Sequence, residues 1–228
     1  MSASTATDWE AAYLRFETPE EEARKFRQRL ERLGQRAWAR ESCVVEICSG
    51  RGSGLRALAE LGFSHLEGLD LSLDLLRHAP NSARQIRGDC RRLPFPDASR
   101  DILIVQGGLH HLASLDDVVD SFREAHRVLR PSGRFVLVEP WRTSFLDFVH
   151  FCCERRWLRR CWPKLDALAC MIDGERETYT RWLAQPDAIQ AAAERFFNSE
   201  RSEVRWGKWL FVGHPRRNDA PTKEGETP

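Results

Sequence analysis

A glycine-rich turn near residue 50 constrains the fold of this chain more than any other segment. Residues 43–48 (Cys-Val-Val-Glu-Ile-Cys) form a short apolar run of the length typical of a buried strand. The turn Gly50-Arg51-Gly52-Ser53-Gly54 follows, and apolar residues then repeat at helical spacing through Leu55, Leu58 and Leu61. This order of strand, glycine-rich turn and helix predicts the first unit of a parallel α/β sheet.

The same alternation of strand and helix patterns continues after the turn as far as Pro140. The apolar patterns predict strands at 65–70, 83–88, 101–106 and 134–139, with a short helix capped by Ser72 and a longer helix over 115–129. The strand at 101–106 is apolar throughout, as expected of a strand buried on both faces. A turn at Pro131-Ser132-Gly133 should separate the long helix from the last of these strands. These elements predict a doubly wound α/β sheet with right-handed crossovers.

The remaining segments predict three additions to this sheet. An amphipathic helix over 18–33 belongs to an N-terminal helical segment, 1–40, and the aromatic-rich stretch 141–184 has helical periodicity and predicts an inserted lid. A helix over 188–197 and a β-hairpin over 201–213 should complete the main domain, 41–214. The polar tail 215–228 has the composition of a disordered segment.

Composition excludes several classes of protein. The chain has 228 residues, 35 basic against 34 acidic side chains and a formal net charge of +1, so no general attraction to nucleic acid is expected. Its seven cysteines lack metal-ligand spacing, and we expect neither a structural metal nor a disulfide framework. The sequence shows no signal peptide and no apolar run of about 18 residues, which predicts a cytoplasmic protein without a membrane span.

Acidic residues stand at or near the ends of three predicted strands, where ligands of α/β sheets bind. Glu46 lies within the first strand and would repel a pyrophosphate but suit a cationic ligand; the spacing G-x-G-x-G also differs from the dinucleotide fingerprint. Asp70 could accept the hydroxyls of a ribose, and Asp89 with the N–H of Cys90 could hold an adenine. Taken singly, these residues could instead form a tight turn, a helix cap and a turn before Arg91. Together they predict a site for a nucleoside without phosphates.

Four segments in this order resemble the class I S-adenosylmethionine-dependent methyltransferases, closest to the branch of ubiquinone and menaquinone methyltransferases that act on small molecules. The segments are Glu46-Ile47-Cys48-Ser49-Gly50-Arg51-Gly52-Ser53-Gly54, Gly88-Asp89-Cys90-Arg91-Arg92-Leu93-Pro94-Phe95-Pro96-Asp97, Leu109-His110-His111-Leu112 and Val128-Leu129-Arg130-Pro131-Ser132-Gly133. Cys48, Ser49 and Ser132 depart from the family pattern, which often has glycine or another small residue there.

The resemblance implies a Rossmann-like, seven-stranded sheet with an antiparallel last strand, and S-adenosyl-L-methionine as cofactor. It also implies roles for individual residues. Glu46 would face the methionine ammonium group, and Gly50 and Gly52 would line the cofactor. The other cofactor-binding residues would be Asp70 and Leu71 at the ribose, Asp89 and Cys90 at the adenine, and Gln106 after the fourth strand.

The acceptor side of the site should follow the fourth and fifth strands. His110 and His111 are candidate general bases because imidazole titrates near neutral pH, and Glu139 is a second possible base or a polar anchor. Either histidine could instead pack under the lid or fix the loop. The sequence therefore predicts methyl transfer to a small-molecule acceptor. Two alternatives stay open, a cofactor-binding regulatory protein without catalysis and an RNA or protein methyltransferase, and neither the acceptor nor the oligomeric state follows from the sequence.

Basic and aromatic residues alternate over 155–164 in the predicted lid. This segment could contact a membrane surface or guide an anionic or lipid-linked acceptor. The favoured interpretation is an ordinary amphipathic helix with a solvated basic face, whose aromatic side chains pack on the core. Cys152, Cys153, Cys161 and Cys170 raise the possibility of a thiol or metalloid site, but we expect buried structural cysteines.

Overall fold

A computed structural model describes residues 3–216, with side-chain detail from residue 8 onward. Its centre is a seven-stranded mixed sheet in the order β3-β2-β1-β4-β5-β7-β6, in which β7 runs opposite to the other six strands. The predicted α/β fold, with seven strands and an antiparallel last strand, is confirmed. The strands are β1 (Cys43–Ile47), β2 (His65–Asp70), β3 (Arg84–Arg87), β4 (Arg100–Gln106), β5 (Leu129–Pro140), β6 (Phe197–Arg205) and β7 (Lys208–Pro215).

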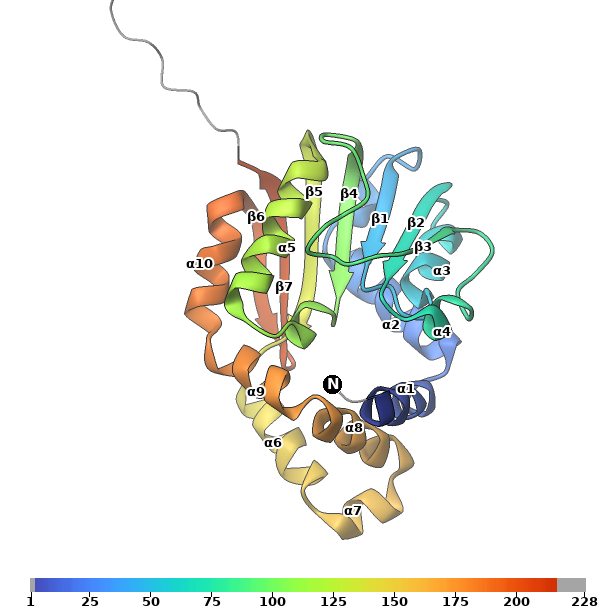
Figure 1. Cartoon of the computed structure of the whole chain (residues 1–228), viewed down its shortest axis with the longest axis vertical. Coiled ribbons are helices and arrows are strands. Elements are labelled where there is room, and N and C mark those ends of the chain that lie inside the picture. The colour runs from blue at the N-terminus through green and yellow to red at the C-terminus, as the bar shows by residue number, and fades with distance from the viewer. Residues whose placement is uncertain (1–2, 217–228) are drawn as a thin grey trace, which may run out of the picture.

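Helices cover both faces of the sheet, and a helical lid lies beyond the carboxyl ends of its parallel strands (Figure 1). One face packs on α5 and α10, and the opposite face on α2 and α3. The helices are α1 (Ala3–Phe16), α2 (Pro19–Arg32), α3 (Ser53–Glu60), α4 (Leu73–Leu76), α5 (Leu115–Val128), α6 (Ser144–Cys153), α7 (Arg156–Cys161), α8 (Pro163–Gly174), α9 (Arg176–Ala184) and α10 (Pro186–Phe196), with short 3-10 turns at Gln35–Ala37 and Leu109–His111.

The alternation of side chains along the central strands builds two separate apolar cores. In β1, Val44 faces α2 and α3, whereas Val45 and Ile47 face α5 and α10. All three side chains are completely buried. Because both faces of a parallel sheet are covered, the strands read as nearly continuous apolar runs in the sequence. Glu46 interrupts this run and is itself buried, which makes it the exception that needs a functional reason.

Helix α2 begins where the sequence predicts a cap. Thr18 accepts a hydrogen bond from the backbone of Glu21, and the Glu21 side chain accepts one from the backbone of Thr18, which completes a capping box. Helix α1 lies in the segment expected to be helical, although the sequence pattern did not resolve it as a separate helix. It packs along α8 of the lid, so the N-terminal segment contacts the lid through α1 and the sheet through α2.

Two boundaries differ from the sequence-based expectation because the strands extend further than their apolar runs. Strand β5 begins at Leu129, and the pairing moves from Arg100 opposite Leu129 to Ile102 opposite Arg134. The predicted turn at 131–133 is therefore a bulge within β5. Strand β6 begins at Phe197 instead of residue 201, and its turn into β7 places Trp206 and Gly207 at positive φ angles of 49° and 71°. Two successive positive φ angles are typical of a tight hairpin turn.

The lid consists of α6 to α9 and confirms the predicted helical character of 141–184. Its aromatic residues, however, do not all pack on the core: Trp157 in α7 and Trp162 directly after it are 65% and 60% exposed, so that expectation was wrong for these two side chains. Most of the lid cysteines are also less enclosed than expected, since only Cys153 is buried and Cys161 is exposed. No described helix is long and apolar enough to cross a membrane. The expectation of a disordered tail over 215–228 was wrong at its start, since Pro215 ends β7 and the N–H of Arg216 bonds the carbonyl of Phe196. Residues 217–228 lie outside the described residues.

We predict that Phe135→Ala lowers the free energy of unfolding by about 3 to 5 kcal/mol. Phe135 is fully buried, and its ring stacks on Phe197 with centroids 4.6 Å apart. Chemical denaturation followed by circular dichroism measures the change. The matched control is Phe148→Ala, because Phe148 is 63% exposed and its loss should change stability by no more than about 0.5 kcal/mol. Equal losses for the two variants would contradict the assignment of this core.

Candidate functional site

The glycine-rich turn adopts a strained path that brings bare backbone to the end of the sheet. Cys48, Gly50 and Gly52 have φ angles of 53°, 54° and 72°. Cys48 is the unusual member, because only glycine adopts this region without steric cost. A Cβ atom at Gly52 would stand 2.7 Å from the Pro80 ring, so glycine is required there for space as well. The turn therefore lets a ligand approach its backbone at close range.

Glu46 lies beneath this turn and is almost completely buried. Its Oε1 atom would stand 2.3 Å from a Cβ at Gly54, and its Oε2 atom has no hydrogen-bond partner among the described residues. Burial raises the pKa of Glu46 well above its ordinary value, and the negative charge of Glu22 adds to this effect. Ser49 Oγ and Gln106 Nε2 are likewise buried without a partner in the described part of the chain. The Glu46 oxygen can accept from a cationic group, and the Gln106 Nε2 can donate to an acceptor, so these orphaned groups fit a ligand that carries both.

Asp70 ties the glycine turn to the end of β2. Its two oxygens accept hydrogen bonds from the backbone N–H of Gly50, at 2.8 Å, and of Ser72, at 2.9 Å. Ser72, rather than Asp70, caps helix α4 by accepting from the N–H of Leu75. Leu71 is 61% exposed beside it. Each Asp70 oxygen retains a second lone pair, so the carboxylate can still accept hydrogen bonds from a ligand.

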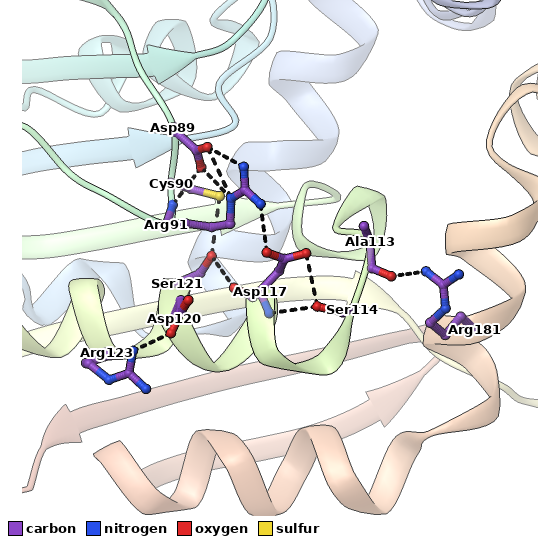
Figure 2. A network of polar contacts seen from close by, with 10 residues as sticks. All are labelled: Asp89, Cys90, Arg91, Ala113, Ser114, Asp117, Asp120, Ser121, Arg123 and Arg181. Carbon is purple, nitrogen blue, oxygen red and sulfur yellow. Dashed lines mark hydrogen bonds and ion pairs between the residues drawn. The ribbon is translucent and has the colours of Figure 1, made fainter. Parts of the chain in front are cut away.

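The loop after β3 is clamped onto α5 by an ion-pair network (Figure 2). Both oxygens of Asp89 accept from the guanidinium of Arg91, which also bonds Asp117 at 2.7 Å. These hydrogen bonds from Arg91 hold the pKa of Asp89 below its ordinary value. The buried Cys90 thiol lies 3.4 Å from the hydroxyl of Ser121. Asp89 therefore has a structural partner in Arg91, and its contact with an adenine stays a prediction.

Glu139 and His110 join the ends of β5 and β4. One Glu139 oxygen accepts from the backbone N–H groups of Gly108 and Leu109, both at 2.8 Å, and the other lies 2.7 Å from His110 Nδ1. The Glu139 side chain is completely buried and that of His110 is 7% exposed. Both carboxylate oxygens thus hold the loop after β4 in place.

Glu175, between α8 and α9, extends this network into the lid. One of its oxygens lies 3.5 Å from His110 Nε2, and the other lies 2.6 Å from His111 Nδ1. The indole N–H of Trp9 in α1 also donates to Glu175, at 3.0 Å. His111 is the most accessible member of the network, with 34% of its side chain exposed.

The two carboxylates control the charge of His110. Burial alone would lower the pKa of His110, but the hydrogen bonds and charges of Glu139 and Glu175 outweigh it and raise that pKa to about 9. Burial likewise favours the neutral form of Glu175, whereas the two histidines bring its pKa down to about 2. At neutral pH, His110 is therefore an imidazolium ion held between two carboxylates.

Helix α1 lies across both halves of the site. Trp9 reaches the histidine network, and Glu10 bonds the hydroxyl of Ser72 at 2.5 Å. The Tyr13 hydroxyl would stand 3.1 Å from a Cβ at Gly50, directly over the glycine turn. Tyr13 also stacks on Trp9 with ring centroids 5.4 Å apart. The first helix therefore contacts the glycine turn, the end of β2 and the lid at once.

The structure brings all of the sequence-predicted site residues to the carboxyl end of the sheet, but sequence reasoning missed two of its members. Glu175 lies in the charged stretch Asp-Gly-Glu-Arg-Glu, a composition typical of a solvated turn. Trp9 lies in the first ten residues, which are otherwise small, polar and acidic. Neither carried a signal that could have found it. His110, His111 and Glu175 have ligand atoms within 4.8 Å of one another, a spacing that can hold a metal ion. Their mutual hydrogen bonds already account for this arrangement, and the absence of a metal stays a prediction.

Comparison with known proteins agrees with this architecture. Residues 45–137 match the model of a family described as a methyltransferase domain. A Synechocystis protein named as an uncharacterized methyltransferase is 31% identical over 181 residues, covering 77% of this chain and 76% of its own length. Demethylmenaquinone methyltransferase of Listeria welshimeri is 24% identical over 189 residues, covering 69% of this chain and 79% of its own. The crystal structure of an S-adenosylmethionine-dependent methyltransferase from Mesorhizobium loti has a TM-score of 0.55 at 20% identity and covers 82% of this chain and 97% of its own.

The chain belongs to the class I S-adenosylmethionine-dependent methyltransferases. It is an enzyme of that class.

We predict that His110 makes the stability of the protein depend on pH above neutrality. Its folded-state pKa of about 9 exceeds the ordinary value of 6.5, so its stabilising contribution is fully present below pH 6.5 and is lost as pH rises through 9. The loss should be of the order of 1 to 3 kcal/mol. Denaturation at a series of pH values should show this decline in the wild type and a flatter profile in His110→Gln. The exposed His78→Gln serves as control, and the same profile in His110→Gln as in the wild type would contradict the prediction.

Proposed function

We propose that this methyltransferase transfers the methyl group of S-adenosyl-L-methionine to a small-molecule acceptor that must lose a proton, and that His111 removes it. The observation that carries the proposal is the pairing of His111 Nδ1 with the ionised Glu175 at 2.6 Å. A carboxylate at Nδ1 fixes the imidazole tautomer in which Nε2 is free to accept a proton. No described residue forms a hydrogen bond with His111 Nε2. His110, by contrast, has both ring nitrogens beside carboxylates.

The cofactor would lie over the glycine turn within the domain 41–214. When bound, S-adenosylmethionine supplies an electrophilic methyl group on its sulfonium. The unpartnered oxygen of Glu46 would accept from the methionine ammonium group, and Gly50 and Gly52 would present their backbone to the same portion. Asp70 and Leu71 would contact the ribose, Asp89 and Cys90 the adenine, and Gln106 the region beside the sulfonium.

Glu139 would act as a positioning residue rather than as a base. Both of its oxygens are occupied, by two backbone N–H groups and by His110, and a carboxylate so engaged has little capacity to accept a further proton. Its hydrogen bonds hold Gly108 and Leu109, which precede the two histidines in the same short turn. The orientation of His111 therefore depends on Glu139 from one side and on Glu175 from the other.

The acceptor would bind between this turn, the N-terminal segment 1–40 and the lid. Aromatic rings surround the histidines: Trp9 meets His111 edge-on at 5.1 Å, and Tyr179 meets His110 at 5.7 Å. An aromatic surround and a near-zero net charge favour a small molecule over RNA. The name of the Listeria relative supports an acceptor of the quinone type.

Glu46→Gln should weaken binding of S-adenosylhomocysteine by roughly 10- to 100-fold, because a hydrogen bond to a charged group is worth about 1.5 to 3 kcal/mol. Isothermal titration calorimetry measures the affinity. 5′-Methylthioadenosine lacks the amino acid portion, so its affinity should be the same for the variant and the wild type. Glu60→Gln, at an exposed position on α3, is the matched control. An equal loss with both ligands would mean that Glu46 supports the fold of the turn and does not contact the ammonium group.

His111→Gln should reduce kcat for methyl transfer by roughly 10²- to 10⁴-fold while leaving cofactor affinity unchanged. The assay uses labelled S-adenosylmethionine with a panel of phenols, quinols, thiols and amines. His78→Gln is the matched control, and added imidazole should restore part of the activity in His111→Ala. Unchanged kcat in His111→Gln would overturn the assignment of the base. Cofactor binding without transfer to any acceptor by the wild type would support a regulatory protein instead.

A further inference from the structure

Every exposed phenylalanine and tryptophan of the described chain lies at one end of the molecule. Large aromatic side chains on a protein surface are normally scattered singly, and a cluster of them marks an interaction site. These six side chains are 44% to 65% exposed and occupy α6, α7, the junction of α7 and α8, and the turn between β6 and β7. We call this set the aromatic rim: Phe145, Phe148, Phe151, Trp157, Trp162 and Trp206.

Helix α6 presents one face outward, and the hairpin turn between β6 and β7 meets that face. Phe145, Phe148 and Phe151 are spaced three residues apart, which places them along one side of a helix. The opposite side of α6 packs Cys153 against Leu165 and Ala169 of α8. Trp206 meets Phe145 edge-on with ring centroids 5.2 Å apart.

Arginine side chains complete the rim and carry positive charge that the described part of the protein does not neutralise. Arg155, Arg156 and Arg160 are exposed, and none of them pairs with a carboxylate of the described residues. The guanidinium of Arg155 lies 4.2 Å above the ring of Phe151. The other two cations of segment 155–164 pair with carboxylates instead: Arg159 bonds Asp166 at 2.9 Å, and Lys164 bonds Glu21 at 2.7 Å. Helix α7 and the two residues that flank it therefore combine two exposed tryptophans with three cations that have no carboxylate partner among the described residues.

We propose that the aromatic rim and these three arginines dock the enzyme on the surface of a bilayer that contains anionic phospholipid. Tryptophan and phenylalanine favour the boundary between headgroups and acyl chains, and arginine pairs with phosphate through two parallel hydrogen bonds. Helix α7 forms the far end of the molecule, with α6 beside it, so these elements can reach a flat surface (Figure 1). A twofold dimer through the same face would bring unpaired guanidinium groups together.

Helix α6 connects the aromatic rim to the histidine network. Helix α6 carries the rim on its outer side, while His150 on the same helix bonds the hydroxyl of Tyr179 at 3.0 Å. Tyr179 in turn packs against His110. Docking through the rim would therefore place the lid, and the site beneath it, against the lipid headgroups. This inference does not depend on which residue acts as the base.

Vesicle co-sedimentation of the full chain, without cofactor or acceptor, tests the proposal. The wild type should bind vesicles that contain phosphatidylglycerol and should bind pure phosphatidylcholine vesicles much less. The triple variant Arg155→Gln, Arg156→Gln, Arg160→Gln should lose roughly 100-fold in its partition coefficient on the anionic vesicles. The double variant Phe148→Ser, Trp157→Ser should lose at least about tenfold on the same vesicles.

Two matched controls separate docking from general effects of charge and apolar area. Arg24→Gln, Arg36→Gln, Arg195→Gln removes the same number of charges from exposed positions elsewhere, and Leu73→Ser removes an exposed apolar side chain from α4. Both should bind as the wild type does. Failure of the wild type to bind anionic vesicles would overturn the proposal. So would equal binding by the rim variants, or a dimer in sedimentation velocity that dissociates in those variants.

Discussion

The imidazolium of His110, held between Glu139 and Glu175, is the interaction on which the arrangement of the site depends. Glu139 belongs to the fifth strand, His110 to the turn after the fourth, and Glu175 to the lid, so one buried cation joins three separate parts of the chain. Two carboxylates enclosed together would repel each other strongly, and the proton on His110 reduces that repulsion. Removal of His110 would leave the two carboxylates facing each other without a cation in a buried position, which is costly. The lid is thus fixed to the sheet electrostatically as well as by packing.

Glu46 shows the opposite condition within the same sheet. Like Glu139 it is buried, yet one of its oxygens has no partner in the described chain. Burial raises the pKa of Glu46. Burial alone would raise the pKa of Glu139 as well, but the hydrogen bonds and charge of its partners outweigh burial and lower it. A fold gains no stability from such a group. The contrast separates a carboxylate that organises the protein from one suited to receive a positively charged ligand.

The sequence predicted the sheet well because its signals are local. The apolar run before Glu46, the glycines after it and the box at Thr18 each report the conformation of their own segment. It also named His110, His111 and Glu139 as candidate site residues, but it could not rank them, since their difference arises from contacts across the fold. Sequence analysis did not find Glu175 and Trp9 for the same reason. Each lies in an ordinary polar stretch, and their hydrogen bond forms only because the lid packs against α1. The outward orientation of Trp157 and Trp162 depends equally on how α7 packs, which helical periodicity does not determine.

Helix α1 touches the glycine turn through Tyr13, the end of β2 through Glu10 and the histidine network through Trp9. A rigid helix of this length cannot leave one of these contacts while keeping the others. The proposed cofactor side and the proposed acceptor side of the site are therefore covered by the same helix. A displacement of α1 would expose both sides to water together, and neither side could be opened alone.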